Sequence, residues 1–202
     1  MNCLLSGIVA GIDEAGRGPL AGPVVSSCVA WQGLPAERAS VNDSKLLTEQ
    51  QRKNLFEWIQ ANAHKIGIGS ATPREIEKLN IHKATLLSMK RAIKAIGIPV
   101  SLILVDGLFA VPSYPRCRTL VKGDRKCFFI ACASIISKVV RDDLMERYDK
   151  LYPQYLFRKN KGYGTEEHLE AIRTYGFSPI HRRTFRGVKE VVDADMADGR
   201  LL

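Results

Sequence analysis

The chain has 202 residues, of which 46% are hydrophobic and 25% are charged, as is typical of one globular domain. Its 30 lysines and arginines exceed its 21 aspartates and glutamates, and the net charge of +9 favours a polyanionic partner such as nucleic acid. No stretch approaches the roughly 18 apolar residues that a membrane helix needs, which excludes that class. Asp13 and Glu14 interrupt the N-terminal apolar run, so we expect no signal peptide. The odd number of cysteines, without a CxxC pair, predicts reduced thiols in a cytoplasmic protein.

The hydrophobic pattern predicts strands that alternate with helices. Strands are expected at 8–10, 23–31, 66–71, 100–105 and 119–121. Helices are expected from the capping boxes at 48–51 and 72–75, and over 83–96, 127–150 and 165–175. The residues from 190 onward turn acidic and are expected to fray. The first two strands leave no room for a crossover helix and should be antiparallel, so we predict an α/β fold with a mixed sheet.

Acidic residues stand within two residues of a glycine at three places near predicted strand ends or helix starts: Asp13-Glu14, Asp106 and Asp124. Carboxylates at adjacent strand ends can converge, and their mutual repulsion then requires a cation. An all-oxygen cluster suits Mg²⁺ or Mn²⁺ better than zinc, and a pair of such ions is a recurring means of cleaving a phosphodiester. The alternative is that Asp106 and Asp124 only occupy turns, where Asp-Gly pairs are common.

The C-terminal part of the chain combines basic and aromatic residues. Between 158 and 189, eight lysines or arginines face three acids and are interleaved with Tyr163, Tyr175, Phe177 and Phe185. Phosphate contacts and stacking rings are what a nucleic-acid groove requires. His181 either touches phosphate there or belongs to a solvated basic turn. We expect a single domain, with a core of about 1–150 and a basic helical extension of about 151–202.

Several motifs together resemble bacterial ribonuclease HII, the type 2 ribonuclease H, over nearly the whole chain. The resemblance is carried by residues 13–19 (DEAGRGP), 43–45 (DSK), 105–107 (VDG), 122–124 (KGD), 133–142 (ASIISKVVRD), 161–165 (KGYGT) and 181–185 (HRRTF). The type 3 enzymes share the acids but depart at Gly-Arg-Gly and usually carry an extra N-terminal domain. Leu46 stands where the family commonly has a second lysine, which puts substrate affinity in question.

The resemblance implies an RNase H-like mixed sheet flanked by helices, with a C-terminal helical extension. It implies an endonuclease that cleaves the RNA strand of RNA–DNA hybrids and nicks 5′ of single ribonucleotides in duplex DNA, leaving 5′-phosphate and 3′-hydroxyl ends. Two Mn²⁺ or Mg²⁺ ions would be bound with the substrate. A monomer is expected, and the C-terminal tail is a candidate contact for a replication clamp.

The resemblance also assigns roles to individual residues. The metal-binding, catalytic acids would be Asp13, Glu14, Asp106 and Asp124. The substrate-binding residues would be Gly16, Arg17, Gly18, Ser44, Lys45, Tyr163, His181 and Arg182. Among them, the Gly-Arg-Gly segment would read the ribose 2′-OH, the group that distinguishes RNA from DNA, and Tyr163 would stack at the junction.

Two other functions remain open from the residues alone. A different metal nuclease or strand-transferase on the same kind of sheet would share the acids without needing a 2′-OH, and cleavage of all-DNA duplexes would favour it. A non-catalytic nucleic-acid-binding module would use the basic segment alone, and binding without metal-dependent cleavage would favour that function.

Overall fold

The computed structural model describes residues 7–35 and 47–197. The chain divides into two compact units, each with a core of its own. The first unit comprises Met1–Ala15, Val25–Ser70 and Thr85–Val140, and the second comprises Gly16–Val24, Ala71–Ala84 and Arg141–Leu202. The division into a core of about 1–150 and a later extension stays a prediction.

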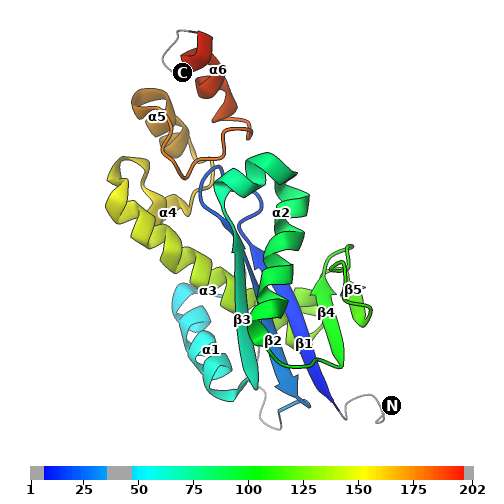
Figure 1. The fold of residues 1–202 in the computed structure, drawn as a ribbon. Helices are drawn as coiled ribbons and strands as arrows, with labels where there is room; N and C mark the ends of the chain where they lie inside the picture. The colour runs from blue at the N-terminus through cyan, green and yellow to red at the C-terminus, as the bar shows by residue number, and fades with distance from the viewer. Residues whose placement is uncertain (1–6, 36–46, 198–202) are drawn as a thin grey trace. The chain divides into compact units, whose positions relative to one another are not determined.

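A five-stranded mixed sheet forms the centre of the first unit (Figure 1). Its strands are β1 (Ile8–Ala15), β2 (Val24–Gln32), β3 (Lys65–Ala71), β4 (Leu102–Asp106) and β5 (Cys117–Leu120), in the order β3-β2-β1-β4-β5. β1 is antiparallel to β2 and parallel to β4, which confirms the predicted mixed sheet. β1 is longer than predicted, because its pairing with β2 continues through both acids to Ala15.

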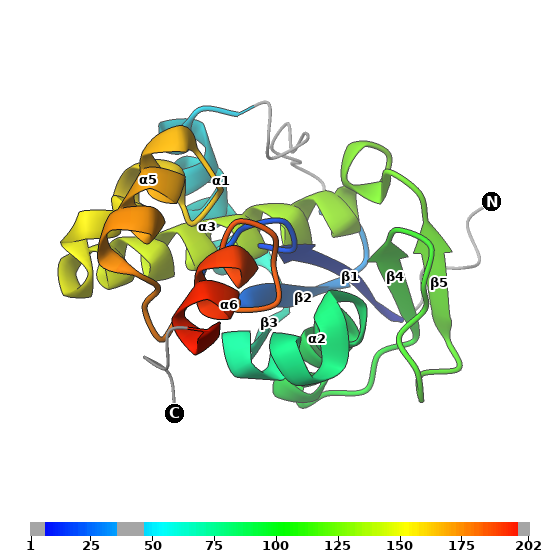
Figure 2. The ribbon, with the colours of Figure 1, turned by 90° about the horizontal axis from the view of Figure 1, so that it is seen from above.

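Helices cover both faces of this sheet (Figure 2). On one face, Ile12 of β1 packs in a cluster with Met89 and Ile93 of α2 (Pro73–Ile96). On the other face, the core contains residues of α1 (Glu49–Asn62) and α3 (Phe128–Leu151). A side chain at Gly11 would come within 2.0 Å of the Phe129 carbonyl oxygen. Because Gly11 has no side chain, α3 can begin directly against β1, close to the acids.

The predicted helix starts are confirmed. At the first, the Thr48 hydroxyl accepts from the Gln51 N–H at 3.2 Å and the Gln51 side chain accepts from the Thr48 N–H at 2.8 Å, a complete capping box. At the second, Thr72 and Glu75 form the equivalent pair at the start of α2. Asn80, with φ of 67°, interrupts α2, so that it consists of two helical segments as predicted.

The second unit is largely helical. It contains the end of α3, the 3₁₀ turn η2 (Pro153–Tyr155), α4 (Phe157–Asn160), α5 (Glu166–Tyr175) and α6 (Lys189–Ala197) (Figure 1). The prediction that residues from 190 fray is wrong as far as Ala197. Val188 and Val192 are buried in the core of this unit, and that burial holds α6 in place.

Two predictions about the chain's class concern its cysteines and its helices. Cys28, Cys117, Cys127 and Cys132 are all free, and Cys28 and Cys132 are buried. Over the described residues, every helix is too short or too polar to cross a membrane.

Candidate functional site

The parallel pairing of β1 with β4 sets two of the predicted acids side by side. Ile12 pairs with Val105, so Asp13 and Asp106 follow at the same level on neighbouring strands. Such strands lie about 4.8 Å apart. Asp13 is buried, with 6% of its surface exposed, and Asp106 is half-buried at the end of β4. Both acids therefore belong to one edge of the sheet.

Asp124 is brought to this edge by a hydrogen bond from the neighbouring residue. The Gly123 N–H donates to Asp106 Oδ1 at 2.7 Å, and Asp124 follows in the 3₁₀ turn η1 (Gly123–Arg125). A Cβ at Gly123 would lie 2.5 Å from Cδ1 of Ile130, so the turn packs closely against the start of α3. Asp124 is buried as well. Within the first unit, the segment that carries Asp124 therefore lies against the end of β4, where Asp106 stands.

Asp13 is a buried carboxyl group with two other acids, Glu14 and Asp106, close to it. Burial raises the pKa of Asp13 well above its usual value of 3.8, and the charges of Glu14 and Asp106 raise it further. Hydrogen bonds from the Ser134 side chain and from the Glu14 N–H, at 2.7 Å, act in the opposite direction and lower this pKa. A buried carboxylate with like charges beside it is stabilised by a bound cation.

The donor set suits a hard cation that also binds other ligands. It consists of carboxylate oxygens, which Mg²⁺ and Mn²⁺ prefer. Within residues 7–35 and 47–197, no three His, Cys, Asp or Glu side chains converge closely enough to hold a metal ion by themselves. Mg²⁺ commonly binds through one or two carboxylates together with substrate phosphates and water. The acids therefore fit a cation whose coordination the substrate completes.

In the sequence, Ala15 alone separates Glu14 from residues 16–23, a segment of the second unit that we call the strap. Its first residue, Gly16, has φ of +95°, and a side chain there would lie 2.0 Å from the Arg141 guanidinium. Only glycine fits this position without strain. Arg17 and Gly18, by contrast, are exposed. The strap thus begins at a buried glycine and exposes the other two residues of Gly-Arg-Gly, Arg17 and Gly18, to solvent.

Two buried arginines hold the strap by its carbonyl groups. Arg182, fully buried, donates to the carbonyls of Gly22, Arg17 and Gly16 at 3.0, 2.8 and 2.5 Å. Arg141 donates to three further carbonyls, those of Ala21, Pro23 and Lys161. Burial, and then the charge of Arg141, lower the pKa of Arg182 to about 9. Arg182, a predicted substrate-binding residue, therefore points at the strap and can influence a substrate only through it.

Tyr163 lies next to the exposed Gly18 of the strap. Its side chain is 48% exposed, and its Cε1 is 3.7 Å from the position that a Cβ on Gly18 would occupy. The adjacent Gly162 carbonyl accepts from the Leu20 N–H at 2.8 Å, which ties the Tyr163 loop to the strap. The exposed ring and the Gly18 backbone are therefore neighbours within the second unit, and their role in binding a substrate stays a prediction.

The remaining predicted residues lie elsewhere. His181 is buried, with 1% of its surface exposed, so both predictions for it, a direct phosphate contact and a solvated turn, are wrong. Ser44 and Lys45 lie outside the described residues, as does Leu46. His168 and Arg141 were given no role from the sequence. For His168 a signal existed, since it stands on the same side of the predicted helix as the apolar Ile172.

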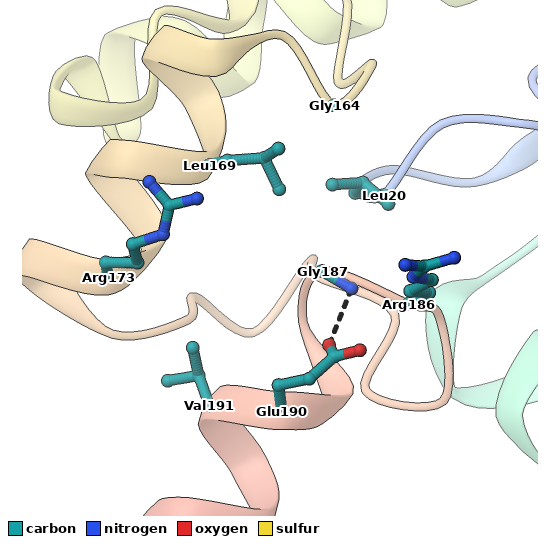
Figure 3. Close-up of a pocket in the computed structure, with 8 residues that line it drawn as sticks. All are labelled: Leu20, Gly164, Leu169, Arg173, Arg186, Gly187, Glu190 and Val191. Carbon is teal, nitrogen blue, oxygen red and sulfur yellow. Dashed lines mark hydrogen bonds between the residues drawn. The ribbon is translucent and has the colours of Figure 1, made fainter.

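A separate cavity of about 520 Å³ lies within the second unit (Figure 3). Leu20, Leu169 and Val191 form its apolar lining, and Arg173 and Arg186 stand at its margin. The Glu190 carboxylate accepts from the Gly187 N–H at 2.7 Å beside it. None of the four acids lines this cavity, so we place the candidate chemistry at the sheet edge.

Comparison with known proteins gives concordant results. A family model described as Ribonuclease HII matches residues 10–188. The ribonuclease HII of Caldanaerobacter subterraneus is 51% identical over 180 residues, which cover 88% of this chain and 73% of that protein. The crystal structure of ribonuclease H2 from Pyrococcus horikoshii superposes with a TM-score of 0.77 at 26% identity, covering 93% of this chain and 98% of the other. Bst-RNase HIII, solved in complex with Mn²⁺, has the same fold, with a TM-score of 0.72 at 18% identity over 95% of this chain and 71% of its own.

Proposed function

Because the chain belongs to the ribonuclease HII family, we propose that it nicks duplex DNA on the 5′ side of a single ribonucleotide as well as cleaving RNA–DNA hybrids. The products would carry 5′-phosphate and 3′-hydroxyl ends. As a member of that family it is a ribonuclease H, a hydrolase that cleaves the RNA of RNA–DNA hybrids. Its basic excess suits both substrates, because phosphate contacts dominate the affinity of proteins for nucleic acids.

In this proposal Asp13, Glu14, Asp106 and Asp124 hold two divalent ions, Mn²⁺ or Mg²⁺. When bound, such ions lower the pKa of the attacking water and stabilise the leaving oxygen. The Mn²⁺ complex of Bst-RNase HIII, a protein of the same fold, supports this choice of ions. The chain's own contribution is to fix the carboxylates. Gly123 holds Asp106, and the Ser134 side chain and the Glu14 N–H hold Asp13.

The strap would read the sugar. Gly18 is exposed and carries no side chain, so its backbone can approach a ribose closely. The 2′-OH both donates and accepts a hydrogen bond, and it is the group by which a protein separates RNA from DNA. Tyr163 would stack on the adjoining nucleotide with its exposed ring. Ser44 and Lys45 would contact phosphate. His181 and Arg182, which are buried, would act on the substrate indirectly, by holding the strap in place.

A monomer in the cytoplasm and a replication-clamp contact through the C-terminal tail remain predictions. The last five residues of that tail lie outside the described chain.

The observation that carries the proposal is the buried Asp13 beside Asp106, with the η1 turn bonded to it. The direct test is incubation with a DNA duplex that contains one ribonucleotide, with Mn²⁺, with Mg²⁺, and with chelator. We expect a single metal-dependent nick 5′ of the ribonucleotide. Cleavage of an all-DNA duplex of the same sequence would support the metal nuclease without sugar discrimination instead.

Substitution of Gly18 tests sugar recognition more cleanly than substitution of Gly16. An added Cβ at Gly18 meets nothing nearer than Tyr163 at 3.7 Å, so we expect Gly18→Ala to keep the thermal stability of the wild type. Its affinity for ribonucleotide-containing duplex should fall by about 1–3 kcal/mol, as for an extra methyl group in a close-fitting site. The affinity for plain DNA, measured in a parallel titration, should change little. Equal weakening on both duplexes would show that Gly18 does not face the ribose.

A further inference from the structure

Two buried histidines of the second unit form a hydrogen-bonded pair that reaches the Tyr163 loop. His168 lies in α5 and His181 precedes Arg182, and their Nε2 atoms are 3.0 Å apart. His168 is fully buried and His181 has 1% of its surface exposed. The rings of Tyr155 and Phe157 pack around them, with the Tyr155 centroid 4.7 Å from that of His181. The pair is therefore enclosed by aromatic rings, away from water.

Backbone groups at both ends fix the direction of this chain of hydrogen bonds. The Ser178 N–H can only donate, and it lies 2.9 Å from His181 Nδ1, which must accept. A neutral His181 then carries its hydrogen on Nε2 and donates it to His168 Nε2. His168 accordingly carries its hydrogen on Nδ1 and donates it to the Tyr163 carbonyl at 2.8 Å. The two ends independently require the same pair of neutral tautomers, and burial lowers the pKa of both rings, which favours the neutral forms.

The same residues are also connected through the strap. His181 forms a β-bridge with Ala21, and the neighbouring Arg182 N–H donates to the Leu20 carbonyl at 2.8 Å. The Leu20 N–H in turn donates to the carbonyl of Gly162, next to Tyr163. Backbone and side-chain hydrogen bonds thus connect the strap to His181, His181 to His168, His168 to Tyr163, and the Tyr163 loop back to the strap. It constrains the spacing between the strap and the Tyr163 ring.

We propose that His168 and His181 are positioning residues that set the Tyr163 ring against the strap and thereby determine cleavage at single ribonucleotides. This inference rests on the role given to Tyr163 and the strap under the proposed function. Neither imidazole reaches the substrate, because both are buried. They act through the Tyr163 carbonyl on one side and the Ala21 backbone on the other.

Two amide substitutions of His168 distinguish a positioning role from a packing role. Asn places an amide N–H near the position of Nδ1, so His168→Asn keeps the donor to Tyr163 and loses the bond to His181. Gln places its amide near Nε2, so His168→Gln keeps the bond to His181 and loses the donor to Tyr163. Both remove the same ring from the same enclosure. A purely structural role would therefore affect both variants alike.

The experiment measures kcat and KM for both variants on a duplex with one ribonucleotide and on a long RNA–DNA hybrid, with thermal unfolding as the control for folding. We expect His168→Gln to lose about tenfold to a hundredfold in kcat/KM on the single ribonucleotide, the size of effect that a displaced contact near the chemistry produces. The loss should be smaller on the hybrid, which offers many registers. His168→Asn should lose less than His168→Gln on the single ribonucleotide, because it keeps the donor to the Tyr163 carbonyl. Equal losses for the two variants, or no loss for His168→Gln, would overturn the proposal.

A measurement on the wild type covers the case in which the variants fail to fold. Nitrogen-15 NMR of the imidazoles at pH 7 should show both rings neutral, with hydrogen on Nδ1 of His168 and on Nε2 of His181. A doubly protonated ring, or the opposite tautomers, would refute the positioning chain. Neither outcome depends on catalysis. Failure of the wild type to cut the single-ribonucleotide duplex would instead count against the proposed function.

Discussion

Asp13→Asn should reduce metal-dependent hydrolysis by at least a hundredfold, because even residues that only support metal ligands are typically worth about 10- to 100-fold. The change keeps the size of the side chain and removes one charge from the edge of the sheet that carries the acids. The measurement is the single-turnover cleavage rate on the single-ribonucleotide duplex with Mn²⁺. Asp193→Asn, on the exposed surface of α6, removes the same charge and serves as the control for net charge. Cleavage by Asp13→Asn near the wild-type rate would contradict the assignment of the acids.

The same variant should be more stable than the wild type when chelator keeps metal away. The pKa of Asp13 is higher in the folded than in the unfolded chain, so the folded state binds more protons between the two values. The stability of the metal-free wild type therefore falls as pH rises above 3.8, the usual value for Asp. Asn does not titrate, so the difference in Tm in favour of Asp13→Asn should grow as pH rises through that window. A difference that shrinks with pH would show that Asp13 is not disfavoured as a carboxylate.

The second large effect is expected for Arg182→Lys, which keeps the charge but not the planar fork of donors. A lysine cannot reach the carbonyls of Gly22, Arg17 and Gly16 together, so at least one buried acceptor loses its partner. We expect a loss of about 3 kcal/mol in the free energy of unfolding, from the range for buried charges and acceptors left unpaired. For a chain of this length that corresponds to a decrease in Tm of roughly 6–12 °C.

The neighbouring arginine provides the matched control for this change. Arg183 is exposed, with its guanidinium 5.1 Å from the centre of the Phe177 ring, so Arg183→Lys should change Tm little. The Arg182→Lys variant should cut the single-ribonucleotide duplex more slowly than the wild type even at a temperature where both proteins are fully folded, because fewer hydrogen bonds hold the strap. If Arg182→Lys and Arg183→Lys gave the same Tm, the anchoring of the strap by Arg182 would be refuted.

The position of the acids at the ends of strands could be predicted from the sequence, because the apolar run before each acid is a local pattern. Asp13-Glu14 follows a run of buried apolar residues, and Asp106 ends the clearest strand of the chain. What the pattern missed is that β1 continues through the acids. Polar side chains interrupt the apolar pattern, whereas the backbone pairing with β2 does not depend on them.

The second unit was less predictable, because its key polar residues face inward. From the sequence, Arg182 and Arg183 are equivalent members of a basic segment. Only the carbonyls of the strap, some 160 residues earlier in the chain, decide that Arg182 is buried and Arg183 exposed. The pairing of His168 with His181 likewise depends on a tertiary contact between α5 and the segment that follows it. No local pattern contains that information.

We propose that the acids act in hydrolysis directed by a ribose 2′-OH, and two duplexes that differ only in that group test this proposal. Two duplexes of identical sequence, one with a single ribonucleotide and one entirely of DNA, are incubated with the wild-type protein and Mn²⁺. We predict a nick 5′ of the ribonucleotide in the first duplex, abolished by chelator, and no cleavage of the second. Equal cleavage of both duplexes, or metal-independent cleavage of the first, would contradict it.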